Sequence, residues 1–65
     1  MTVQDVEDQV ANIRAVAGDD EAAHSWEDQL RQSVLEAIAN GADNPADIAR
    51  AALKTSDIEF ARWCA

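Results

Sequence analysis

Apolar side chains recur at alternating steps of three and four residues along the first part of the chain, which is the spacing of one face of an α-helix. The positions are Val3, Val6, Val10, Ile13 and Ala17. Thr2 is a favourable N-cap, and Asp5 three residues later completes a pair like a capping box. Gly18 follows as a natural C-cap. The pattern therefore predicts an amphipathic helix over residues 2–17.

A second stripe with the same spacing predicts a longer helix over residues 20–40. Its members are Ala23, Trp26, Leu30, Val34, Ala37 and Ile38. Trp26 stands in the middle of the stripe, so we expect it in the core. Leu35 lies outside the stripe, which suggests that this helix buries two faces near its C-terminal end. Asn40-Gly41 then ends the helix.

Two short helices are expected in the rest of the chain. Asn44-Pro45 is a strong start signal, because proline is favoured at the first helical position. The buried face of the helix that follows would carry Ile48, Ala49, Ala52 and Leu53. Ser56 and Glu59 form a capping box, and the helix they begin would carry Ile58, Phe60, Ala61, Trp63 and Cys64. We predict an all-α fold, a compact bundle of about four helices with the last two short, in a single domain over residues 1–65.

The length and charge of the chain limit its chemistry. A domain of 65 residues is near the lower limit for a stable core, so deep catalytic pockets are not expected. The net charge of −8 should repel nucleic acid and anionic membranes and attract basic protein surfaces. Cys64 is the only cysteine, which leaves no disulfide and no Cys/His metal set. With no long apolar run or targeting signal, we expect a cytoplasmic protein of a bacterial host cell, without cofactor or metal.

The negative charge is concentrated in the first half of the chain. Residues 1–36 hold nine acids against two arginines, a net of −7, whereas residues 37–65 hold four acids against three bases. The nine are Asp5, Glu7, Asp8, Asp19, Asp20, Glu21, Glu27, Asp28 and Glu36. Carboxylates three or four residues apart on a helix are spaced by about 5–6 Å, close to successive phosphates of a nucleic-acid strand. The alternative is that these acids only keep a small protein soluble.

The direction of these side chains divides the nine acids into two groups. Asp5 and Asp8 point away from the valine stripe, and Glu21, Asp28 and Glu36 point away from the stripe of the second helix. We predict that these five contact the partner. The other acids, Glu27 among them, are expected to flank that surface.

The chemical groups of the chain do not form a recognisable catalytic site. His24 and Ser25 are neighbours, so on a helix they point about 100° apart and cannot act as a nucleophile and base. His24 lies outside the apolar stripe and is expected in solvent. Helix capping explains Asp19 and Asp20 better than a cation site does. Trp63 falls at the edge of an apolar face, where it would be either core or interface.

One segment resembles a helix-turn-helix. In the stretch from Asn44 to Ile58, Ile48-Ala49 takes the place of the motif's aliphatic and small residues, and Ser56 would begin its second helix. The turn of that motif favours glycine, where this chain has Leu53-Lys54. Asp57 and Glu59 would lie on the recognition helix, where phosphates repel them. We interpret the stretch as helix-packing geometry without DNA binding.

In size, helical content, charge and general character, the whole chain resembles the small acidic anti-CRISPR proteins of phages. That resemblance implies a DNA mimic that occupies the basic DNA-binding surface of a CRISPR effector, with a type I system preferred. We therefore expect a monomeric, non-enzymatic inhibitor that binds a basic nucleic-acid-binding protein and no nucleic acid or membrane. One alternative is a degenerate helix-turn-helix regulator that uses Arg50, Lys54 and Arg62. Another is a homo-oligomeric module joined through Val3, Val6, Val10 and Trp63.

Overall fold

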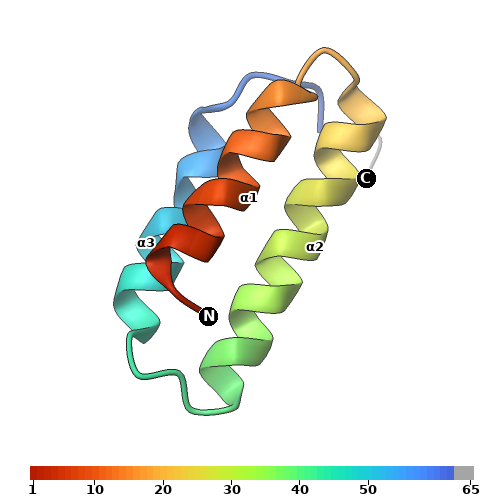
Figure 1. Ribbon diagram of the computed structural model, residues 1–65. Coiled ribbons are helices and arrows are strands. Elements are labelled where there is room, and N and C mark those ends of the chain that lie inside the picture. The colour runs from red at the N-terminus through yellow and green to blue at the C-terminus, as the bar shows by residue number, and fades with distance from the viewer. Residues whose placement is uncertain (63–65) are drawn as a thin grey trace.

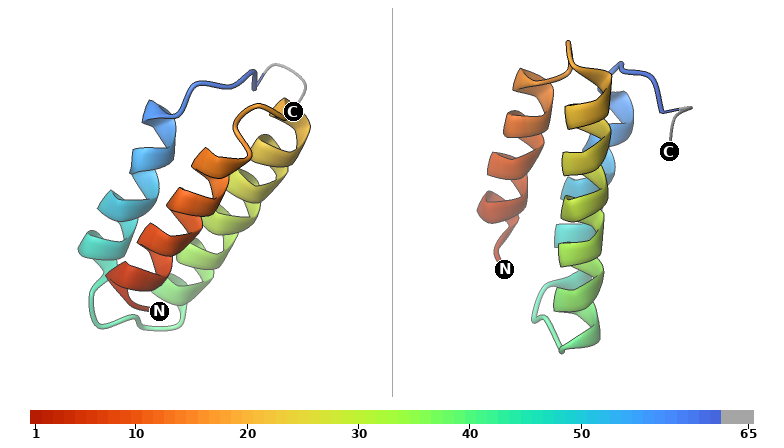
Figure 2. Two further views of the ribbon diagram at one scale, coloured as in Figure 1. Left: turned by 45° about the horizontal axis from the view of Figure 1, so that its top comes forward. Right: turned by 90° about the vertical axis from the view of Figure 1, so that its right-hand side faces the viewer.

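Three α-helices run up, down and up beside one another in the computed structural model, which describes residues 1–62 (Figure 1). They are α1 (Val3–Ala15), α2 (Asp20–Ala39) and α3 (Pro45–Leu53), and a 3₁₀ turn, η1 (Lys54–Asp57), follows α3. Each helix packs against the other two, so the core lies on the axis of a triangular bundle (Figure 2). The prediction of an all-α fold is confirmed, although the bundle has three α-helices in place of four.

Capping groups set the bounds of α1 and α2. Thr2 and Asp5 exchange the two bonds of a capping box: the Thr2 amide donates to the Asp5 carboxylate at 2.9 Å, and the Asp5 amide donates to the Thr2 hydroxyl at 3.1 Å. Asp19 caps α2 by accepting from the Ala22 amide at 3.1 Å. Gly41 ends α2 with a φ of 87°. Its amide and that of Ala42 donate to carbonyls in the last turn of the helix, as in a Schellman motif.

The core contains apolar side chains of all three helices together with Ile58, whereas Leu53, which we had predicted on the buried face of α3, is 62% exposed. Its buried members are Val6, Val10, Ile13, Ala23, Leu30, Val34, Ile48, Ala51, Ala52 and Ile58. The buried positions on α2 are 23, 27, 30 and 34, so Glu27 occupies the stripe that we had assigned to Trp26. Trp26 was expected in the core but is 42% exposed. Leu35 is 66% exposed, so the expectation that α2 buries a second face is also wrong.

The predicted fourth helix does not form in the described residues. After η1 the backbone becomes extended at Ile58, with φ −86° and ψ 124°, and continues as an irregular segment to Arg62. The Arg62 guanidinium accounts for this conformation, because it donates to the carbonyls of Ile58 at 3.1 Å and Thr55 at 2.9 Å. In the predicted helix a backbone amide would bond the Ile58 carbonyl, whereas the Thr55 carbonyl also accepts the Ile58 amide at 3.0 Å at the end of η1. Trp63 and Cys64, which we had placed on that helix, lie outside the described residues.

Candidate protein-binding surface

An ion pair between a buried carboxylate and a half-buried arginine joins α2 to the segment that follows η1. The carboxylate of Glu27 is only 2% exposed. Arg62 binds it with two parallel bonds, Nε to Oε1 and Nη2 to Oε2, each 3.0 Å long. Arg31 approaches the same carboxylate at 3.7 Å from one turn along α2. We call Glu27, Arg31 and Arg62 the C-terminal clamp.

Further bonds fix the segment on which Arg62 lies. The guanidinium packs over the ring of Phe60, 3.9 Å from its centroid, and also donates to the Phe60 carbonyl at 3.4 Å. The Ala61 amide donates to Asp20 at 3.1 Å. The side chain of Arg31 reaches the hydroxyls of Thr55 and Ser56 in η1. Both the 3₁₀ turn and the extended segment are therefore attached to α2 by side-chain bonds.

The environment of Glu27 keeps its carboxylate ionised. Burial alone would raise the pKa of Glu27, because it removes the charge from water. The hydrogen bonds from Arg62 and Thr55, together with the charge of Arg31, outweigh burial and leave the pKa below its ordinary value. The same carboxylate raises the pKa of Arg62. Glu27 therefore has a structural role, and our prediction that it flanks the partner-binding surface is wrong because it is buried.

The C-terminal clamp pairs two of the chain's five lysines and arginines with one buried carboxylate. The clamp carries +1 of the chain's −8, so the remaining residues carry −9. The other eight predicted acids are all exposed, and we call them the acidic surface: Asp5, Glu7, Asp8, Asp19, Asp20, Glu21, Asp28 and Glu36. Within residues 1–62, none of these eight forms an ion pair with a lysine or arginine. Their charge is therefore available to a partner.

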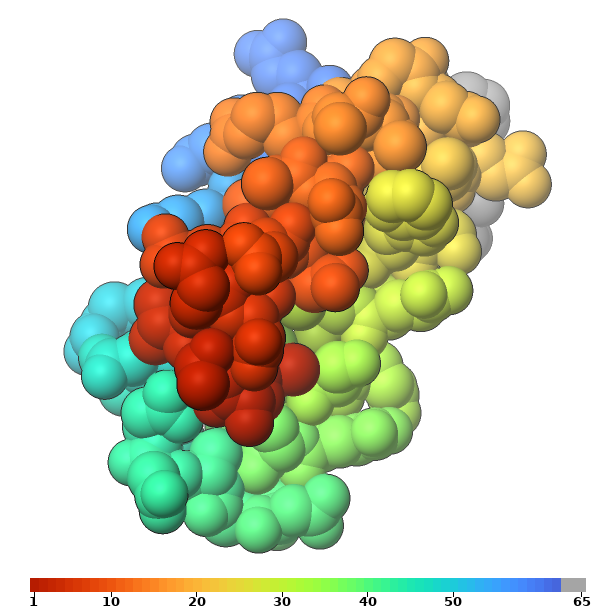
Figure 3. Space-filling model, viewed as in Figure 1, coloured from red at the N-terminus to blue at the C-terminus, as the bar shows by residue number. Residues whose placement is uncertain are grey.

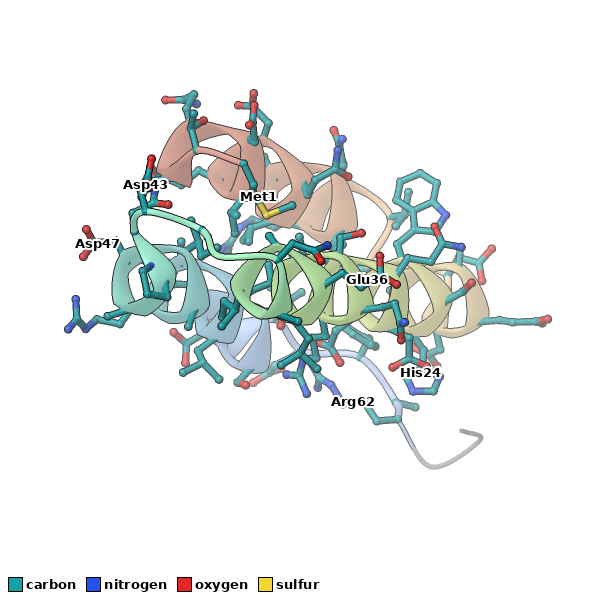
Figure 4. The ribbon with its side chains drawn as sticks, turned by 90° about the horizontal axis from the view of Figure 1, so that it is seen from below. Met1, His24, Glu36, Asp43, Asp47 and Arg62 are labelled. Atoms are coloured by element: carbon teal, nitrogen blue, oxygen red, sulfur yellow. The ribbon has the colours of Figure 1, made fainter. Side chains whose placement is uncertain are left out.

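The acidic surface does not form one continuous row. Glu36 follows Asp28 by eight residues, which rotates it by about 80° around α2. Asp28 lies 3.6 Å from the imidazole of His24, and Figure 4 shows His24 and Glu36 on different sides of α2. The prediction of a solvated His24 is wrong, since its side chain is only 16% exposed. Other acids bond to neighbours on their own helix, as Asp8 does to Gln4.

A groove between α1 and α2 meets a second hollow at Trp26. The groove has a volume of about 450 Å³, and its walls are Met1, Asp5, Gln9, Asn12, Trp26, Gln29, Leu30 and Ser33. The hollow, at the start of α2, has a volume of about 350 Å³ and is lined by Asp19, Glu21, Ala22, Ser25 and Trp26. Figure 3 shows the face of the molecule on which α1 and α2 lie side by side. Three of the predicted acids, Asp5, Asp19 and Glu21, thus line cavities that share one indole.

A smaller groove lies between α2 and α3. It has a volume of about 240 Å³ and is almost entirely apolar. Leu35 and Leu53 flank it, and both are more than 60% exposed. Two of the three valines that we proposed for a homo-oligomeric interface, Val6 and Val10, are unavailable because they are in the core, and Val3 is partly buried.

Comparison of the chain with protein-family models, curated proteins and solved structures gave no match. In residues 1–62, no three or more His, Cys, Asp and Glu side chains gather as metal ligands would. No helix in that part of the chain has the length and apolarity to span a membrane. The surface of α1 and α2 is therefore interpreted from its own geometry and charge.

Sequence reasoning missed two features of this surface, namely the burial of Glu27 and the exposure of Trp26. A signal for both was present in the spacing. Positions 23, 27, 30, 34 and 37 alternate steps of four and three, whereas a stripe through Trp26 needs two successive steps of four, from 26 to 30 and from 30 to 34. Residue type favoured tryptophan for the core, and the burial of Glu27 depends on Arg31 and on the distant Arg62, which compensate its charge.

Proposed function

We propose that this protein is a non-enzymatic inhibitor whose acidic surface binds the basic surface of a nucleic-acid-binding protein and so blocks its access to DNA. A type I CRISPR effector is our preferred target. The observation that carries the proposal is the set of eight exposed carboxylates on α1, α2 and the turn between them, none of which pairs with a lysine or arginine within residues 1–62. Like charges at this density cost stability, and a cationic partner would remove that cost.

The regulator alternative has less support. Of its three cations, Arg62 is bound in the C-terminal clamp, and Arg50 pairs with Asp47 at 3.1 Å. The backbone after η1 is extended where a recognition helix would be needed. We therefore expect no mobility shift of duplex DNA by the protein alone, even at low salt, where phosphate binding is strongest.

The proposal can be tested with a purified type I CRISPR surveillance complex and labelled target DNA. The protein should prevent the complex from binding DNA. A variant with Asp8→Asn, Asp28→Asn and Glu36→Gln should inhibit more weakly, because its association loses electrostatic steering, and its inhibition should depend less on salt. Asp5 and Asp19 are kept because their carboxylates cap helices.

The matched control replaces cations in and beside α3, with Arg50→Gln and Lys54→Gln. Both side chains are exposed and lie outside the acidic surface, so inhibition should be unchanged. Loss of inhibition in this control, with full inhibition by the carboxylate variant, would contradict the proposal. Undisturbed DNA binding in the presence of the wild-type protein would exclude this target.

A further inference from the structure

Trp26 has an unusual position for a large aromatic residue in so small a protein. Among residues 1–62, four large hydrophobic side chains are exposed, and Trp26 is the only aromatic one. It forms a wall of both the α1–α2 groove and the hollow at the start of α2. An exposed indole between two hollows resembles the central aromatic anchor of many protein interfaces.

The surroundings of Trp26 are acidic and lack cations. Asp5 lines the groove, and Asp19 and Glu21 line the hollow. No lysine or arginine lines either one. The amide side chains of Gln9, Asn12 and Gln29 supply further hydrogen-bond acceptors in the groove. A ligand that matches this lining has a positive charge, several donors and a flat surface to place against the indole.

Among protein side chains, arginine meets all three requirements. Its guanidinium is planar, carries five N–H donors and stacks on aromatic faces, while the lysine ammonium is compact and more strongly hydrated. Tryptophan is the most favourable aromatic partner for a cation. The same chain already contains this combination, since Arg62 binds the Glu27 carboxylate and lies over the ring of Phe60.

We infer that the α1–α2 groove and the adjoining hollow bind an arginine-bearing segment of the basic partner, with Trp26 stacked on a guanidinium. This inference rests on the proposed function and specifies which part of the acidic surface receives the partner. Met1, at the wall of the groove, and Arg62 lie on opposite sides of α2 (Figure 4). The partner can therefore bind without opening the C-terminal clamp.

The test measures binding of two peptides of equal length, oligoarginine and oligolysine, to the full chain. The background is Trp63→Phe, so that Trp26 is the only tryptophan and its fluorescence reports contact. Oligoarginine should bind about two- to five-fold more tightly than oligolysine, because the planar guanidinium stacks on the indole and is less strongly hydrated than the ammonium, and it should change the emission of Trp26. Trp26→Ala should remove this preference, and Trp26→Phe should restore part of it.

Two further variants separate the inference from the proposed function. The carboxylate variant Asp8→Asn, Asp28→Asn, Glu36→Gln should weaken both peptides alike, because it removes charge without altering the indole. Leu35→Ala, which truncates an exposed leucine at the α2–α3 groove, should weaken neither. Circular dichroism verifies that each variant is folded.

Several outcomes would overturn the inference. If Trp26→Ala keeps the arginine preference while the carboxylate variant weakens binding, the partner binds elsewhere on the acidic surface and the proposed function stands. Equal affinity of the wild type for both peptides, or weakening by Leu35→Ala, would also reject the Trp26 site. If neither peptide binds at low salt, both the inference and the proposed function fail.

Discussion

Trp26 and Glu27 are adjacent, and their side chains lie in environments opposite to those that their polarity favours. The indole is 42% exposed, and the carboxylate is 2% exposed. Consecutive residues of a helix point about 100° apart, so only one of the two can face the core. Glu27 faces inward because Arg62 and Arg31 compensate its charge there.

The first prediction concerns the contribution of Trp26 to stability. Trp26→Ala should lower the free energy of unfolding by less than about 2 kcal/mol, since much of the indole stays in water in the folded protein. Leu30→Ala is the matched control, because Leu30 lines the same groove but is 4% exposed. It should cost about 2–5 kcal/mol. Urea denaturation measures both, and a larger loss for Trp26→Ala than for Leu30→Ala would contradict the structure.

The second prediction concerns the buried ion pair. Glu27→Ala should cost about 1–3 kcal/mol, because it leaves Arg62 and Arg31 without their partner, although water reaches both side chains, which are 35% and 45% exposed. In a double-mutant cycle with Arg62→Ala, the two changes should couple by about 1–3 kcal/mol. The exposed pair between Arg50 and Asp47 is the control, and Asp47→Ala should cost less than about 1 kcal/mol. Additive losses for Glu27 and Arg62 would show that the pair does not form.

The third prediction is a pH dependence with a definite sign. Since the pKa of Glu27 is lowered from 4.5, its ion pairs stabilise the fold fully above that value, and the stabilisation is lost as the pH falls through the lowered pKa. Protonation of the acidic surface acts in the opposite direction by relieving repulsion. Glu27→Gln has no charge to lose, so between about pH 6 and about pH 3 its stability should fall less than that of the wild type. The measurement is the urea midpoint of each protein across this pH range. If the midpoints of the wild type and of Glu27→Gln fall in parallel, the lowered pKa of Glu27 is contradicted.

At the scale of the helices, the sequence correctly predicted those helix ends that are fixed by hydrogen bonds between residues close together in the chain. The capping box at Thr2 and the Gly41 terminus lie where the sequence placed them. The capping box expected at Ser56 did not produce a helix: the backbone is extended at Ile58, and the Arg62 guanidinium donates to the Ile58 carbonyl, which a helix would pair with a backbone amide. That arginine is itself held by a carboxylate 35 residues earlier. A pattern read over a few residues contains no information about such a contact.

The fourth prediction compares the two glycines, of which only Gly41 ends a helix; our prediction that Gly18 caps α1 is wrong, because α1 ends at Ala15 with Val16 as its C-cap. Gly41 has a φ of 87°, a conformation that costs an L-residue about 1–2 kcal/mol, so Gly41→Ala should destabilise the protein by about that amount. Gly18 does not have a positive φ, and an added Cβ would have no heavy atom within 4 Å. Gly18→Ala should therefore be neutral or stabilise by up to about 1 kcal/mol. Thermal unfolding of the two variants provides the measurement, and the reverse order would contradict these backbone conformations.

At the scale of the whole molecule, the sequence predicted which part of the chain is acidic but not which of the acids lie on the surface and which in the core. Composition alone located a net charge of −7 in residues 1–36. Eight of the nine acids are on the surface as expected, but Glu27 is in the core. The grooves between the helices depend on how three helices pack together. Their lining, including the exposed Trp26, therefore could not be deduced from the stripe of any one helix.

The C-terminal clamp also bears on the order of events during folding. Most contacts of a three-helix bundle join neighbouring helices, and such local topologies fold quickly. The pair between Glu27 and Arg62 closes a loop of 35 residues, whose entropic cost falls once α2 and α3 have docked. We expect it to form after the rate-limiting step. In stopped-flow experiments, Glu27→Gln should speed unfolding and leave the folding rate nearly unchanged. The clamp would then set the lifetime of the folded protein and have little effect on how fast it is reached.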